Sequence, residues 1–180
     1  MPLFPVWPKR QAQIFQILPV PVVIVTLTQK TIMLSTTLKT LLIRDLNKLK
    51  EELELYQDEA NIWRIDHNIL NSAGNLCLHL AGNLNAYIGG ALGHSGYIRN
   101  RPEEFSQKNL PRAELIDKIK QTIAMVEATL PLLTDVQMQT EYPDEVNGTR
   151  QTTGYFLVHL AMHLSYHLGQ VNYHRRLLDR

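Results

Sequence analysis

Apolar residues recur every three or four positions through four successive segments of this chain, at 38–53, 76–92, 115–130 and 156–171. An α-helix makes one turn in 3.6 residues, so this spacing places the apolar side chains of each segment on one face of a helix. No segment shows a convincing alternation of apolar and polar residues, which a half-buried strand would require. The pattern therefore predicts an all-α protein.

Residues at the ends of these segments favour helix starts. Ser35 and Thr36 are candidate N-caps of the first helix and Ser72 opens the second, because a side-chain oxygen can accept a bond from the unpaired N–H groups there. Pro111 suits the first turn of the third helix, and the fourth runs from about Thr153 almost to the C-terminus. Four amphipathic helices of similar length within about 145 residues most economically form one four-helix bundle.

Residues 1–32 differ in composition from the rest of the chain. Five of the nine prolines lie in the first 21 residues, and no acidic residue precedes Asp45. An apolar run at 14–27 is too short to cross a bilayer as a helix, two prolines interrupt it, and no small-residue cleavage site follows it. We interpret 1–32 as a disordered arm, as an extension from a start codon placed too early, or as a poor export signal, and 33–180 as one folded domain.

Two of the expected connections, 93–110 and 134–152, are longer than simple bundle turns. Long connections are often functional. In one arrangement, both connections cover one end of the bundle.

The charge balance and the cysteine count exclude several classes of function. Eighteen Lys and Arg residues and seventeen Asp and Glu residues give a formal net charge of +1. No basic patch is interleaved with aromatic residues, so nucleic-acid binding is not expected. Cys77 is the single cysteine, which excludes an internal disulfide and a cysteine-based zinc cluster and fits a reducing compartment. We therefore expect a cytoplasmic protein that binds neither nucleic acid nor membrane.

Histidines concentrate on the fourth predicted helix. His159, His163, His167 and His174 follow one another at steps of four, four and seven, which places all four within about 40° of His163 around the helix. Two imidazoles one turn apart can converge on one metal ion, and a third ligand from a neighbouring helix would complete a site with room for water. Histidines can also pack in a core or an interface with hydrogen-bonded ring nitrogens, and the pattern alone does not decide between these interpretations.

The second predicted helix carries a matching polar line. His79, Asn83 and Tyr87 follow at steps of four, so an imidazole, an amide and a phenol share one side. Asn83 and Tyr87 are candidates for substrate binding, with hydrogen bonding inside the bundle as the alternative. Cys77 lies about 200° around the helix from His79, so we expect it to be a small buried residue away from the site.

These residues carry a family resemblance. His79 in the second helix, followed by HLSYHLGQ from His163 to Gln170 in the last, resembles the DinB-like superfamily of four-helix-bundle metal proteins, which includes bacillithiol S-transferases. HLAGNLNAYIGGALG and GYIRNRPEEFS resemble a bacterial subgroup of that superfamily more closely. The resemblance spans about residues 34 to 180 and implies a four-helix bundle of DinB-like type, often a homodimer.

The resemblance also implies a metal site. Its metal-binding triad corresponds to His79, His163 and His167, while His159 and His174 lie outside it. The metal of the family is usually a divalent ion such as zinc or nickel. Three neutral imidazoles leave such an ion its full charge, which favours ionisation of bound water or of a substrate thiol.

From this we expect a metal-dependent enzyme that transfers a low-molecular-weight thiol to an electrophile. A hydrolase that uses metal-activated water and a metal-binding protein without turnover are the alternatives. The chain has no HExxH, GxSxG or P-loop motif. Arg99 and Arg101 are candidates for holding the carboxylate of a peptide-like thiol, because guanidinium groups bind carboxylates well. The alternative is a solvated loop in which they pair with Glu103 and Glu104.

Overall fold

The structure is a computed structural model that describes residues 33–146 and 148–180. Within these residues α-helices dominate and no strand forms, although two isolated β-bridges join Glu141 to Thr152 and Val146 to Thr149. The prediction of an all-α protein is therefore confirmed. The interpretation of residues 1–32 lies outside the described residues and stays a prediction.

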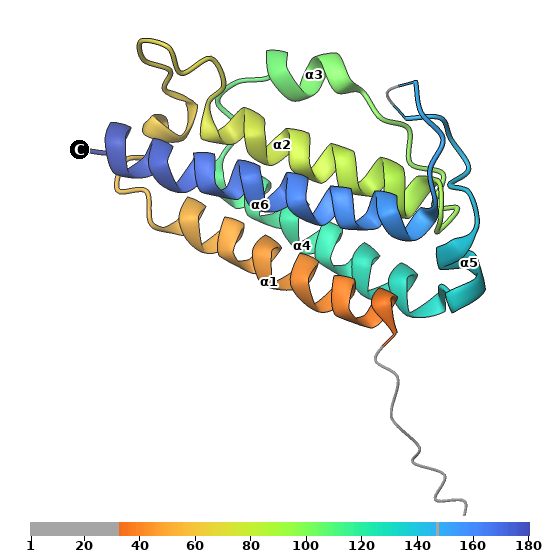
Figure 1. Ribbon diagram of the computed structural model, residues 1–180. Helices are drawn as coiled ribbons and strands as arrows, with labels where there is room; N and C mark the ends of the chain where they lie inside the picture. Colours follow the sequence, from red (N-terminus) through yellow and green to blue (C-terminus); the bar gives the residue numbers. More distant parts are fainter. Residues whose placement is uncertain (1–32, 147) are drawn as a thin grey trace, which may run out of the picture. The chain divides into compact units, whose positions relative to one another are not determined.

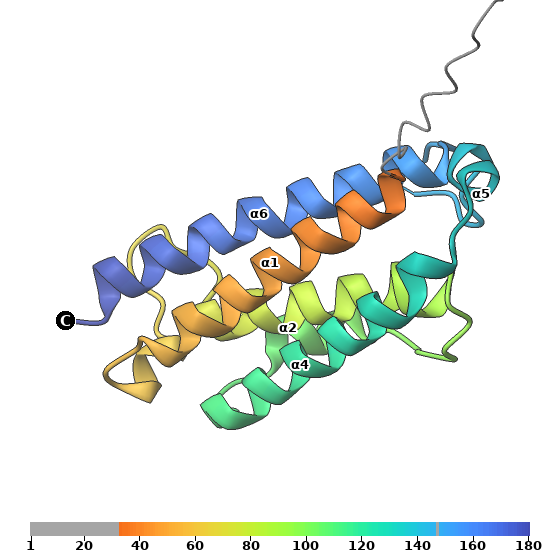
Figure 2. The same ribbon diagram turned by 90° about the horizontal axis from the view of Figure 1, so that it is seen from below.

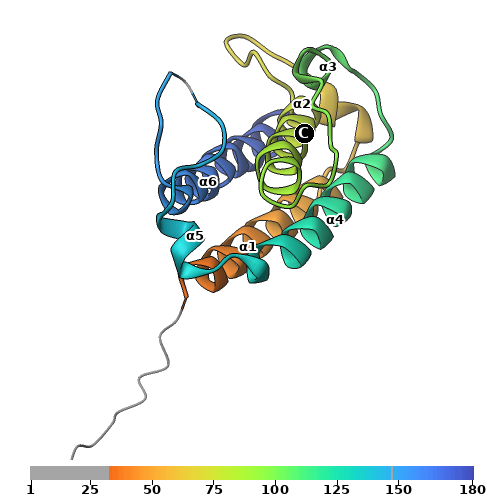
Figure 3. The same ribbon diagram turned by 90° about the vertical axis from the view of Figure 1, so that its right-hand side faces the viewer.

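Four long helices form the bundle (Figure 1). They are α1 (Leu34–Glu54), α2 (Ala73–Leu84), α4 (Arg112–Thr129) and α6 (Thr153–Leu178). Both α1 and α2 pack against α4 and against α6, so α1 and α2 occupy diagonal corners of the bundle. The end-on view in Figure 3 shows this arrangement. As a result α2 and α6, which carry the predicted site residues, are direct neighbours.

The predicted apolar stripes form the core. In α1 every leucine of the stripe is buried, at positions 38, 42, 46, 49 and 53. The stripes of the other three helices are buried or partly buried against them. Because burial of each such side chain contributes about 1.5–3 kcal/mol, this shared core is the main source of stability.

Of the four predicted helix starts, three lie close to the observed ones and the capping prediction for the first is wrong. The helix α4 begins at Arg112, directly after Pro111, which takes the N-cap position. Ser72 caps α2, since its hydroxyl accepts a bond from the Asn75 N–H. The structure begins α6 at Thr153, as expected. The prediction that Ser35 or Thr36 caps α1 is wrong, because α1 already begins at Leu34 and its N-cap position has no side-chain hydrogen bond. Ser35 and Thr36 lie inside the first turn, after the N-cap position that Met33 occupies, so neither hydroxyl serves as the cap.

The two long connections take different courses. Segment 93–110 contains α3 (Arg101–Ser106), which packs along the outer side of α2 and does not cover an end of the bundle (Figure 1). Segment 134–152 contains α5 (Asp135–Gln139), which packs against α6 and α1 at the end where both begin (Figure 2). Only the second connection therefore places a helix at an end of the bundle.

The predicted second helix does not continue as an α-helix beyond Leu84. Residues Asn85–Gly90 form a π-helix, η2, whose wider turn frequently occurs next to functional sites. Among the described residues, none of the helices combines the length and apolar character needed to cross a membrane.

Candidate metal centre

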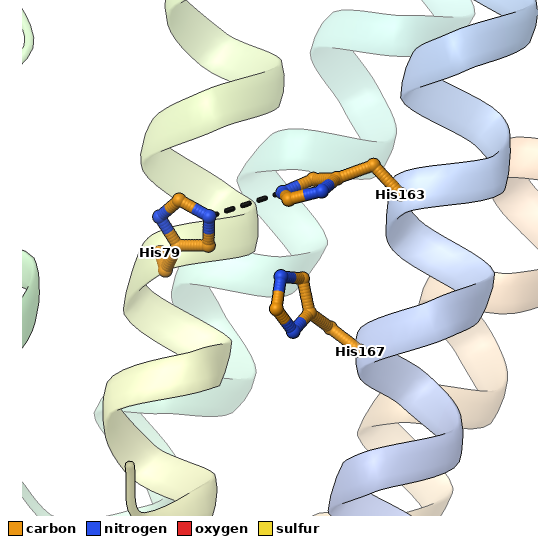
Figure 4. Close-up of side chains that lie close together, drawn as sticks. All are labelled: His79, His163 and His167. Carbon is orange, nitrogen blue, oxygen red and sulfur yellow. Dashed lines mark hydrogen bonds between the residues drawn. The ribbon is translucent and has the colours of Figure 1, made fainter. Parts of the chain in front are cut away.

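Three imidazoles meet between α2 and α6. His79 comes from the middle of α2, and His163 and His167 come from successive turns of α6 (Figure 4). One ring nitrogen of each lies within 4.8 Å of the others, and the Nε2 atoms of His79 and His163 are 3.0 Å apart. We call these three residues the histidine triad. The helical spacing thus brings together the three histidines that the resemblance indicated.

The orientation of His79 is fixed by Glu104 of α3. The Nδ1–H of His79 donates to Glu104 Oε2 at 2.9 Å, and both side chains are 7% exposed. Because a carboxylate only accepts, the proton of His79 lies on Nδ1, which leaves Nε2 with a lone pair directed at the centre of the triad. A carboxylate behind a ligating histidine is the usual partner that orients such a ring in metal sites.

Arg99 holds this carboxylate in turn. Its Nε donates to Glu104 Oε1 at 2.7 Å and its Nη2 to Oε2 at 2.8 Å, and the guanidinium lies 5.7 Å from the centre of the Tyr87 ring. The two arginine candidates therefore differ. Arg99 forms an ion pair with Glu104, as in the alternative interpretation that gave the arginines acidic partners, whereas the Arg101 side chain is exposed.

Gly82 makes room for this carboxylate. A Cβ atom built on Gly82 would overlap Glu104 Oε1 and crowd Glu104 Cδ. Any side chain at this position of α2 would push the carboxylate away from His79 Nδ1. The glycine of the HLAGN sequence therefore serves the packing of α3 on α2.

His167 is oriented from within its own helix. The Nδ1–H of His167 donates to Gln170 Oε1 at 2.6 Å, so the Nε2 atom again is the nitrogen left for the centre of the triad. Gln170 belongs to the HLSYHLGQ motif, and no role was predicted for it from the sequence. Its position one turn after His167 is the signal that would have found it.

The surroundings keep His163 and His167 uncharged at neutral pH. Burial, with smaller effects from His167 and His79, lowers the pKa of His163 to about 4. Burial also lowers the pKa of His167. Burial alone would raise the pKa of Glu104, but hydrogen bonds from His79 and Arg99 outweigh it and lower that pKa. Neutral imidazoles beside an ionised carboxylate are what binding of a divalent cation requires.

The residues present fit a divalent metal ion. The triad offers three imidazole nitrogens as metal ligands, and hydrogen bonds to Glu104 and Gln170 fix the far sides of His79 and His167. Three imidazole ligands suit zinc or nickel and leave positions for a further ligand. The arrangement can therefore hold a metal, and it does not by itself distinguish between these two ions.

The other two histidines of the stripe lie outside this group. His174 is buried, accepts a bond from the Tyr56 hydroxyl at 2.7 Å and donates to the Arg64 carbonyl at 2.8 Å, so it is a packed core residue. His159 is exposed, and its ring stacks on Phe156 with centroids 6.0 Å apart.

A cavity of about 190 Å³ opens beside the triad. Its walls include His79 and His163, the turns that follow His79 in the chain, and the first turns of α6. We call it the polar cavity. All four predicted substrate-binding residues line it: Asn83, Tyr87, Arg99 and Arg101. Asn83 is 8% exposed, and its Oδ1 atom is buried without a hydrogen-bond partner in the described part of the chain. An unpaired buried acceptor in a cavity wall is costly unless a ligand or water pairs with it.

Cys77 does not belong to this site. It is fully buried in the core cluster, and burial raises the pKa of its thiol to about 12. The prediction of a small buried residue is confirmed. Any reactive thiol must therefore come from another molecule.

A bundle with three inward histidines on neighbouring helices defines a class of helical proteins able to bind metal. The sequence model of the DinB superfamily matches residues 42–171, and the chain belongs to this superfamily. A crystal structure of a conserved protein from Enterococcus faecalis is similar, with a TM-score of 0.67, 20% identity, and coverage of 82% of this chain and 98% of that chain. At this identity the likeness supports the fold alone. None of the curated proteins matches this chain.

Proposed function

We propose that the histidine triad binds zinc or nickel and that the protein is an enzyme transferring a low-molecular-weight thiol to an electrophile. The observation that carries the proposal is the place of the triad, whose nitrogens converge at the edge of the polar cavity. When bound, a divalent cation held by neutral imidazoles favours the ionised form of a thiol or of water near neutral pH.

The chain's own residues supply binding groups for a thiol that resembles an amino acid. Arg101 is the exposed guanidinium of the polar cavity and binds the carboxylate of the thiol. Asn83 Oδ1 accepts a hydrogen bond from its amine or amide N–H. Arg99 acts through Glu104 on His79 and is a positioning residue, which revises its expected role in substrate binding.

In the proposed reaction the sulfur of the thiol forms a bond to an electrophilic carbon. The thiol proton passes to solvent, and a leaving group departs with the electron pair of the broken bond. Hydrolysis, the alternative, would use water in place of the thiol. A metal-binding protein without turnover remains the third candidate. Turnover that depends on added thiol favours the transferase, and metal-dependent turnover of an ester without thiol favours the hydrolase.

The test uses the cobalt-substituted protein and three small thiols. Cysteine carries both a carboxylate and an amine, cysteamine lacks the carboxylate, and 3-mercaptopropionate lacks the amine. We expect cysteine to change the cobalt absorption spectrum at the lowest concentration. Arg101→Ala should weaken cysteine and leave cysteamine unaffected, whereas Asn83→Leu should spare 3-mercaptopropionate. Arg150→Ala is the matched control, because Arg150 pairs with Glu141 on the surface. A cobalt spectrum unchanged by all three thiols contradicts the transferase.

A homodimer is also part of the proposal. Val158, Met162 and Tyr166 expose apolar side chains on three successive turns of α6, a face that a second copy can cover by symmetric helix packing. Sedimentation equilibrium should give twice the 20.7 kDa mass of the chain, and Met162→Glu should give the single mass. A wild-type chain that sediments as a monomer at all concentrations contradicts it. The expected cytoplasmic location likewise stays a prediction.

A further inference from the structure

The short helix α3 brings two side chains to His79. The Glu104 carboxylate accepts the bond from His79 Nδ1–H, and the Phe105 ring lies beside the imidazole, with ring centres 5.0 Å apart. A helix of six residues has little stability of its own. The places of both side chains therefore depend on what holds α3 against α2 (Figure 1).

Asn75 of α2 binds the C-terminal end of α3. Its Nδ2 amide group donates to the Glu104 carbonyl at 3.0 Å and to the Gln107 carbonyl at 2.9 Å. Carbonyl groups at this end of a helix have no partner within the helix. Here one side chain, only 1% exposed, supplies the partner of two of them. The end of α3 is thus fixed on α2 by hydrogen bonds as well as by packing.

The amide of Asn75 is itself held in one orientation. Its Oδ1 atom accepts from the Ser72 hydroxyl at 2.7 Å and from Lys108 Nζ. Both N–H groups and both acceptor sites of the amide are therefore in use. A flipped amide would set its oxygen against the two carbonyls of α3, and two acceptors form no hydrogen bond. The network therefore defines where the Glu104 backbone lies on α2.

Asn75 and His79 hold Glu104 from successive turns of α2. They lie four residues apart, so they share one side of the helix. Asn75 binds the backbone carbonyl of Glu104, and His79 binds its carboxylate. Arg99, the other partner of the carboxylate, precedes α3 in the chain and lies outside α2. Of the bonds to Glu104, the one from Asn75 therefore fixes its backbone relative to the helix that carries His79.

We propose that Asn75 is a positioning residue of the metal centre. By fixing the Glu104 carbonyl on α2, it sets the distance from the Glu104 carboxylate to His79 Nδ1 and so keeps the His79 ring directed at the centre of the triad. The inference rests on the metal binding of the proposed function. In the described structure the Asn75 side chain bonds to no member of the triad and does not line the polar cavity.

The first test needs no metal. In the metal-free chain with isotope-labelled histidine, the Nδ1–H of His79 should give a slowly exchanging NMR signal, because it is buried and bonded to a carboxylate. The signal is identified by its absence in His79→Ala. Asn75→Ala should make this proton exchange rapidly. Asn85→Ala is the matched control, because the Asn85 amide also donates twice, to the Ala81 carbonyl at 2.9 Å and to the Thr122 hydroxyl at 2.8 Å, but not to α3.

The second test is zinc affinity, measured by competition with a chromogenic chelator. Asn75→Ala should weaken zinc binding about tenfold, the lower end of the range typical for groups that support a metal ligand. In a Glu104→Gln background the same substitution should change the affinity by less than about twofold, because the path to His79 is already broken. Asn75→Asp removes both donors and keeps an acceptor for Ser72 and Lys108, so it replaces Asn75→Ala if that variant does not fold.

The outcomes separate this inference from the proposed function. An unchanged His79 ring signal in the folded Asn75 variant overturns the inference. So does an equal loss of zinc affinity in the wild-type and Glu104→Gln backgrounds, which is the result expected of a residue that only stabilises the fold. A wild-type chain that binds no zinc overturns the proposed function, and the exchange of the His79 ring proton then decides the inference by itself.

Discussion

Replacing Glu104 by glutamine should weaken metal binding without removing any ligand. The carboxylate accepts one bond from His79 at 2.9 Å and two from Arg99 at 2.7 and 2.8 Å. Glutamine has nearly the same shape, but one of its two terminal atoms is a donor and would face a donor of His79 or Arg99. The ring of His79 then loses its fixed tautomer and part of its basicity. Changes of this kind typically cost about 10–100-fold in metal affinity, or about 1.4–2.7 kcal/mol.

The assay is competition for zinc against a chromogenic chelator, with circular dichroism to confirm that the variant folds. Glu103→Gln is the matched control, because Glu103 precedes Glu104 directly and is exposed, and in the described structure its carboxylate bonds only to the Asn100 side chain. We expect the control to bind zinc as the wild type does. Equal zinc affinity of folded Glu104→Gln and of Glu103→Gln would show that the carboxylate plays no part in orienting His79.

Four further predictions follow from the same geometry. Alanine at any one member of the histidine triad should lower the metal content measured by elemental analysis, whereas His159→Ala should not; the reverse result would move the site along α6. Gly82→Ala should reduce zinc affinity as Glu104→Gln does, by crowding the Glu104 carboxylate. Cys77 should react with a thiol reagent only after unfolding, because it is fully buried and its pKa is about 12; rapid labelling of the folded chain would contradict this. Burial lowers the pKa of His174, so its stabilising contribution is complete above about pH 6.5 and is lost as the pH falls. Between pH 7.5 and pH 5.5, the free energy of unfolding measured in urea should therefore decrease less in His174→Gln than in the wild type; an equal decrease would contradict this.

The helices could be predicted from the sequence because their burial pattern is local. The leucines of α1 follow one another at helical spacing, and all five are buried. The triad could be predicted for a related reason, because His163 and His167 lie one turn apart on one helix and the family resemblance indicated His79. Helix ends could be predicted less well, because Ser35 has the side chain of a cap but α1 begins one residue earlier, at Leu34.

The groups around the triad could not be predicted, because they depend on how distant segments fold back. Glu104 is 25 residues from His79 and reaches it only because α3 packs on α2. The role of Arg99 follows from the same packing. The loop 68–71 and the end of α6 line one hollow of about 380 Å³, and nothing in either local sequence indicates that they lie together.

Because Gly82 has no side chain, the effect of Gly82→Ala on thermal stability should have opposite signs in the wild type and in a Glu104→Ala variant. Glycine inside a helix costs about 1 kcal/mol relative to alanine, so α2 is less stable than it would be with a methyl group at this position. In the wild type that methyl group would collide with Glu104, and Gly82→Ala should lower the thermal midpoint. In a Glu104→Ala background the collision is absent, and the same substitution should raise the midpoint. At position 82, helix stability is thus lower than it could be, and the Glu104 carboxylate has a fixed place in return. The non-additivity of the two substitutions, measured by thermal unfolding, gives the size of this effect.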